Sequence, residues 1–158
     1  MDDSGGRAGR SDYGRPDRRV GKRMVVQDLT AAEYKQMALD LLVRADDALM
    51  ARDYDSVSPM LWGALEHALA AAAVECGWQP PQTDDETELR EIVKRLEKER
   101  GKDKILDYMS GAGIFKDNMN VRYLEDYEFD FFAPSTSRFV LKLLNQNGVD
   151  TCNSATGE

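Results

Sequence analysis

The side chain best suited to acid–base chemistry in this chain is His67, because it is the only histidine among the 158 residues. An imidazole with an unperturbed pKa of about 6.5 suits proton transfer at neutral pH. A site that needs two histidines of one chain is excluded, and His67 lacks the companions of a metal site, so no metal is expected. Two interpretations stay open: a core or interface histidine with one hydrogen bond, or a catalytic or ligand-binding residue.

A second polar cluster runs from Arg122 to Glu128 and combines one base, three acids and two tyrosines. Arg122 is the best candidate for a contact residue, because a guanidinium can bind a phosphate or carboxylate with two hydrogen bonds. Together with Glu125, it could line a cleft with polar groups from two subunits. Alternatively, the cluster is a solvated helix end, followed by three phenylalanines that pack under the last helix.

The sequence contains no motif that predicts a bound cofactor. The glycines of Gly111-Ala112-Gly113 lack both the preceding strand and the basic residue that a phosphate-binding loop needs. No nucleophile with an adjacent base can be identified either. We therefore expect no cofactor.

The elements that position these residues are predicted to be helices. Apolar residues recur at spacings of three and four, period-2 alternation is absent, and capping boxes stand at Thr30–Glu33 and Thr83–Glu86. Helices are predicted near 30–52, 56–77, 85–100, 104–125 and 135–146, with a break or kink at residues 110–113. The expected fold is all-α, a single-domain antiparallel bundle of four to five helices. Its expected core residues are Leu41, Ala45, Leu61, Leu65, Ala68, Leu69, Leu96, Phe139 and Leu143.

The charge of the chain is divided unevenly between its start and its body. The net charge is −8, yet residues 1–24 hold seven basic residues and four aspartates, which gives +3 there and leaves −11 for the rest. Residues 1–27 are predicted to be a disordered basic arm, 28–148 the helical domain and 149–158 a flexible tail. The arm is either a solubilising tail or a weak contact for RNA or a protein partner. The acidic body argues against reading of duplex DNA.

A cytoplasmic protein without membrane spans is the simplest expectation for this composition. No uninterrupted apolar run approaches the roughly 18 residues that a membrane span needs, and the start of the chain lacks the apolar middle of a secretion signal. The two cysteines, Cys76 and Cys152, show no metal-ligand spacing. We expect them not to form a disulfide, as in a reducing compartment.

One segment resembles a known family. Asp53-Tyr54, followed by Leu61-Trp62-Gly63-Ala64-Leu65-Glu66-His67-Ala68-Leu69-Ala70, resembles the second helix of HEPN (higher eukaryote and prokaryote nucleotide-binding) domains. The run 120–125 fits the place of the "H-x-N-F-Y-E" stretch in small prokaryotic relatives, and 139–144 fits their aliphatic last helix. The resemblance covers about residues 30–145.

The resemblance implies an RNA-related protein, but the motif of the family's ribonucleases is not intact. Those enzymes resemble one another in an Arg, four to six residues, then His motif, which meets its copy across a symmetric dimer and cleaves RNA without a metal. Here Lys116 and Asn120 replace the pair in one register, and Arg122 has no following histidine in the other. Asparagine cannot exchange a proton near neutral pH, so only His67 could restore the chemistry.

Three functions follow as alternatives. The first is a non-catalytic HEPN-like protein that acts through a partner or as a homodimer, in a toxin–antitoxin or defence context. For this function, Tyr54 and Trp62 beside small residues suit a helix–helix interface. The second is a metal-independent ribonuclease or nucleotide-handling enzyme with a non-standard active site. The third is a helical adaptor outside the family.

Overall fold

The computed structural model describes residues 29–83, 85–100 and 104–145. Five helices account for most of these residues, and no strand occurs among them. The helices are α1 (Ala31–Met50), α2 (Tyr54–Glu75), α3 (Glu86–Arg100), α4 (Ile105–Asn120) and α5 (Asp126–Asn145). The predicted all-α bundle is therefore confirmed, whereas the predicted arm at 1–27 and tail at 149–158 lie outside the described residues.

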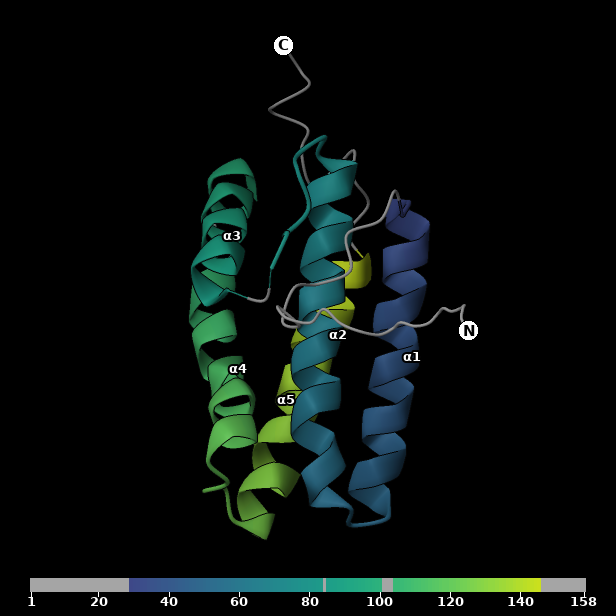
Figure 1. Cartoon of the computed structure of the whole chain (residues 1–158), viewed down its shortest axis with the longest axis vertical. Helices are drawn as coiled ribbons and strands as arrows, with labels where there is room; N and C mark the ends of the chain where they lie inside the picture. The colour runs from purple at the N-terminus through teal and green to yellow at the C-terminus, as the bar shows by residue number, and fades with distance from the viewer. Residues whose placement is uncertain (1–28, 84, 101–103, 146–158) are drawn as a thin grey trace, which may run out of the picture.

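Helix α2 is the central element and packs against each of the other four helices. Figure 1 shows α1 on one side of it, α3 and α4 on the other, and α5 behind it. Helices α1 and α2 run in opposite directions, as do α4 and α5, with the short connections 51–53 and 121–125 between them. A helix with neighbours on several sides must be apolar or small nearly all round, as the alanine-rich segment is.

The composition of α2 reflects this central position. Among the described residues, α2 is the one helix that is long and apolar enough to cross a membrane, yet 67% of that stretch is buried inside the bundle. This degree of burial is typical of a helix in the core of a bundle and not of a membrane span. Gly63 permits the close approach of α1, because a Cβ at this position would lie 3.2 Å from Leu41 Cδ1.

The start of α1 confirms the first predicted capping box. The Thr30 hydroxyl accepts from the Glu33 N–H at 3.1 Å, and the Glu33 carboxylate accepts from the Thr30 N–H at 2.8 Å. The second predicted box is wrong, since Asp85 rather than Thr83 caps α3, accepting from the Thr87 N–H at 2.9 Å. The predicted break at residues 110–113 is also absent, because α4 continues through these residues as one helix, which tolerates glycine at a modest cost.

The boundary between the last two helices differs from the prediction. Helix α4 ends at Asn120 rather than near residue 125, and α5 begins at Asp126 rather than near residue 135. The Glu128 carboxylate accepts from the Glu125 N–H at 2.8 Å, and acids in the first turn suit the positive end of a helix dipole. Pro134 therefore lies inside α5, where it removes one backbone hydrogen bond instead of starting the helix.

The predicted core is confirmed apart from one residue. Eight of the nine expected side chains are buried in one cluster, and Leu41 packs against that cluster while partly exposed. The expectation that the cysteines are unpaired is wrong for Cys76 at the C-cap of α2, which is disulfide-bonded. That expectation depended on a reducing compartment, in which disulfides are rare, and not on any geometric obstacle to a bond at Cys76.

Candidate functional site

Arg122 lies in the link between α4 and α5, at the end of the bundle where α2 begins. Its guanidinium makes two ion pairs, at 3.1 Å with Asp55 of α2 and at 3.8 Å with Asp126 of α5. The guanidinium carbon also lies 5.7 Å from the centre of the Phe129 ring. Arg122 is therefore held between α2 and α5 while about half of its side chain stays exposed.

Asn118, a buried residue near the end of α4, holds this link in place. Its amide nitrogen donates to the Ser58 hydroxyl of α2 at 3.1 Å, and its amide oxygen accepts from the Tyr123 and Leu124 N–H groups at 2.8 and 2.9 Å. One side chain thus ends α4, turns the chain and fastens the turn to α2. The position of Arg122 depends on this arrangement, because both residues after it are tied to Asn118.

A cleft of about 480 Å³ opens beside the link. It is lined by Asp55, Ser58, Pro59, Asn118, Met119, Asn120 and Arg122. Two of the predicted site residues, Asn120 and Arg122, thus share one cavity. Sequence analysis did not single out the buried polar pair Ser58–Asn118, because its two members are 60 residues apart and only the fold brings them together.

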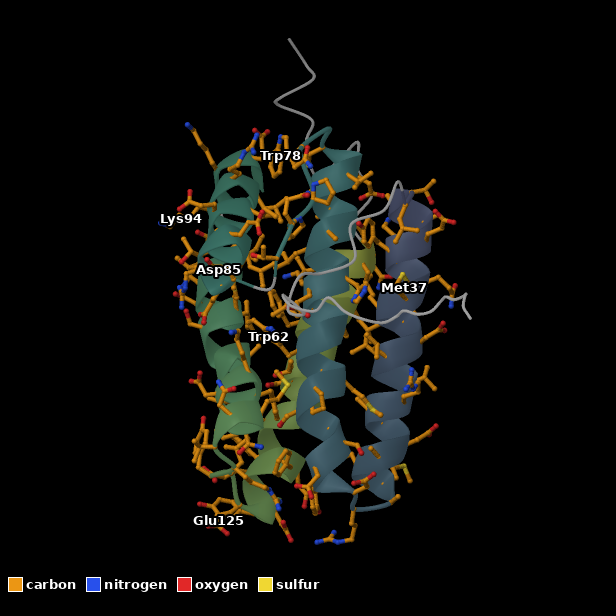
Figure 2. All side chains as sticks on the ribbon, viewed as in Figure 1. Met37, Trp62, Trp78, Asp85, Lys94 and Glu125 are labelled. Atoms are coloured by element: carbon orange, nitrogen blue, oxygen red, sulfur yellow. The ribbon has the colours of Figure 1, made fainter. Side chains whose placement is uncertain are left out.

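The surroundings of the cleft are acidic. Two exposed carboxylates, Asp55 and Asp126, face the guanidinium, and Glu125 lies exposed at the same end of the bundle, as Figure 2 shows. Partial burial, followed by the nearby charges of Asp117 and Glu128, raises the pKa of Tyr123 above its ordinary value of 10.0, so this phenol donates hydrogen bonds and carries no charge in the cleft region. Arg122 is thus the one cation of the cleft and is already neutralised by acids, which disfavours a polyanionic ligand.

Tyr54 and Trp62 are buried inside the chain. The Tyr54 hydroxyl donates to Asp130 at 3.2 Å, and its ring lies 5.1 Å from that of Phe129. Burial is the main cause that raises the pKa of Tyr54, so its hydroxyl keeps the proton that it donates. Trp62 is 3% exposed and lies between α2 and the α3–α4 side of the bundle (Figure 2). Both aromatics join helices of one chain, and neither offers surface to another molecule.

His67 lies on a different face of α2 from the cleft. Its Nδ1 is 2.7 Å from the Gly63 carbonyl oxygen, so Nδ1 carries the proton of this hydrogen bond, since a carbonyl only accepts. Its ring is 6.2 Å from that of Tyr34 on α1. Nine residues separate His67 from Ser58, which is about two and a half helical turns and roughly 13 Å along the axis. The histidine therefore points away from the cleft that holds Arg122.

Lys116 is half-buried on α4 and does not line the cleft, although Asn120, one turn later, does. The structure thus brings together Arg122 and Asn120 and leaves Lys116 and His67 apart from them. Among the described residues, no three His, Cys, Asp or Glu side chains are placed to hold a metal ion.

The fold is an all-α bundle. A polar link between its last two helices carries Arg122 at the edge of the cleft. A family model described as HEPN domain matches residues 31–146. The chain belongs to the HEPN domain family, which confirms the resemblance seen in its second helix. The comparisons with curated proteins and with solved structures found no match.

Proposed function

We propose that this HEPN domain protein is non-catalytic and acts by binding a protein partner, as a homodimer. The observation that carries the proposal is the placement of its single histidine. His67 faces α1 and is hydrogen-bonded within its own helix, whereas Arg122 lies on the opposite side of α2. Without a proton-transferring group beside the arginine, the ribonuclease chemistry of the family loses about 10²–10⁴-fold in rate.

The charges around Arg122 favour a protein partner over RNA. An arginine that cleaves RNA must be free to stabilise a phosphorane, but this guanidinium is paired with Asp55 and Asp126. A partner that presents a carboxylate can exchange for one of these exposed acids at small cost, because exposed ion pairs are weak. The negatively charged phosphates of RNA would instead be repelled by both Asp55 and Asp126.

The setting that we propose is a toxin–antitoxin or defence system of the cytoplasm. In such a system, a HEPN domain that has lost its chemistry still offers a surface for a partner. Disulfides are rare in a reducing cytoplasm, so the disulfide of Cys76 argues against this location, and labelling of Cys76 in intact cells tests it. Labelling only after reduction would contradict a cytoplasmic location.

Incubation with RNA tests the absence of catalysis. Wild type, His67→Ala and Arg122→Ala are incubated with single-stranded and structured RNA in a chelating buffer, with Lys94→Ala on the exposed face of α3 as the matched control. We expect no cleavage above the blank by any of them. Cleavage by wild type and by the control that both site substitutions abolish, with helicity intact by circular dichroism, would overturn the proposal.

A ribonuclease with a non-standard site is the second candidate, and one observation favours it. Arg122, Asn120 and the Ser58 hydroxyl line the same cleft, so a phosphate seated there would contact polar groups from two helices and the link. This candidate makes a separate prediction in the same assay. Cleavage would then depend on Arg122 and Asn120 but not on His67.

A further inference from the structure

One outward stripe on α5 is exposed although it contains large aromatic side chains. We call Tyr127, Phe131, Pro134, Arg138 and Leu141 the α5 stripe. Their spacing of four, three, four and three places them on one face of the helix. Tyr127 is 71% exposed and Phe131 is 72% exposed. Exposed aromatic residues on one helix face are typical of a protein–protein contact.

The charges beside the stripe are separated along the helix. Four acids lie at residues 125–130, and two bases, Arg138 and Lys142, lie in its second half. Neither base makes an ion pair with any residue of the described chain, although both are exposed. The helix is thus acidic at its start and basic toward its end, and the described residues give the bases no partner.

We propose that the α5 stripe is the interface with a second copy of this chain, packed antiparallel about a two-fold axis. The proposal rests on the proposed function, which includes a homodimer, and names the surface. With the axis between Pro134 and Ser135, Phe131 faces the partner's Arg138, and Glu128 lies on the same flank as the partner's Lys142. Each contact occurs twice, as a two-fold interface requires. Arginine over an aromatic face adds a cation–π contact.

A second copy fits the stripe better than RNA does. Single-stranded RNA needs aromatics within a basic groove, but the aromatic half of this stripe is the acidic half. The antiparallel arrangement instead places the acids of each subunit against the bases of the other. The other exposed apolar face, on α1 around Val43, lacks this separation, since acids lie on both sides of it at residues 40, 46 and 47.

The area is sufficient for an interface core. At about 70% exposure, Tyr127 and Phe131 from both subunits bury on the order of 400–700 Å² when covered. A stable interface buries roughly 1,200–2,000 Å² in total. The remainder comes from neighbouring surface, including an apolar cavity of about 210 Å³ between α4 and α5 that Phe132 lines. Phe132 touches Phe131 edge to face, with ring centres 4.9 Å apart, so the cavity borders the stripe.

The first test measures the oligomeric state of the full chain by sedimentation equilibrium. Phe131→Glu is compared with Val43→Glu, which places the same charge on the exposed face of α1. We expect wild type and Val43→Glu to be dimers and Phe131→Glu to dissociate more than about 30-fold more readily, as for loss of an interface hot spot. Circular dichroism checks that both variants keep their helicity. A dimer that Phe131→Glu leaves intact would overturn the proposal.

The second test uses the symmetry of the interface. Glu128→Lys alone places two lysines beside each other at both contacts, and Lys142→Glu alone places two acids there. Each variant is therefore expected to dissociate more readily than wild type. A mixture of the two restores both contacts and should form heterodimers as tight as the wild-type dimer. Failure of the mixture to associate, with each variant folded, would overturn the antiparallel arrangement.

The outcomes separate this proposal from the proposed function. A wild-type monomer at all concentrations would overturn the interface and the homodimer together. A dimer that is insensitive to the α5 substitutions would overturn the interface alone. RNA cleavage by a dimer that Phe131→Glu dissociates would instead overturn the non-catalytic function and leave the interface standing. If a monomer bound RNA through Arg138, the partner of the α5 stripe would be RNA and not a second copy of the chain.

Discussion

Asn118 carries the strongest stability prediction, because one buried side chain serves three groups. Asn118 is 6% exposed and bonds the Ser58 hydroxyl and the N–H groups of Tyr123 and Leu124. Asn118→Ala removes all three hydrogen bonds and leaves the Leu124 N–H buried without an acceptor. At about 1 kcal/mol for each bond, with more for a buried group left unpaired, the loss is about 3 kcal/mol.

Urea denaturation followed by far-UV circular dichroism measures this loss, and the corresponding fall in Tm is on the order of 10 °C. Asn120→Ala is the matched control, because Asn120 is exposed two residues later and should change stability by less than about 0.5 kcal/mol. Ser58→Ala should cost about 1 kcal/mol, and the double variant less than the sum of the two. An Asn118→Ala variant as stable as the Asn120→Ala control would refute this account of the link.

Three further predictions concern the rest of the bundle. Tyr54 has a folded pKa above its ordinary value of 10.0. The stability that it contributes is therefore complete below pH 10 and is lost as the pH rises further, which lowers Tm at alkaline pH. Tyr54→Phe should make this fall in Tm smaller. Leu65→Ala should lower the free energy of unfolding by about 2–5 kcal/mol in urea titrations, because Leu65 is fully buried on α2. Deletion of residues 1–27 should leave Tm unchanged in a thermal melt; a fall of several degrees would show that the arm docks on the body.

The sequence was sufficient to predict those helices that depend on local signals. The capping box at Thr30–Glu33 and the three-and-four spacing of apolar residues located α1 correctly. The predicted start of α5 near residue 135 is wrong because Pro134 resembles the first position of a helix, where proline is common. The better signal was local as well: Glu125 and Glu128 have the spacing of a cap, and acids fill the first turn.

The candidate site was only partly predictable. Arg122 could be chosen from its chemistry, and the structure places it in a cleft with Asn120. The Ser58–Asn118 pair could not be chosen, because a serine and an asparagine 60 residues apart carry no mutual signal in one sequence. For His67, helical spacing alone gives its separation from Ser58, but only the fold shows that Ser58 faces the cleft.

These placements connect the proposed absence of catalysis with the proposed dimer. The link 121–125 positions Arg122 beside Asp55, and it also sets where α5 begins and thus how the α5 stripe is presented. Pairing of α5 with a second copy leaves His67 on the face of α2 that packs toward α1, away from the link of its own subunit. A dimer built through α5 would therefore leave the His67 and Arg122 of each subunit apart, as the proposed non-catalytic function requires.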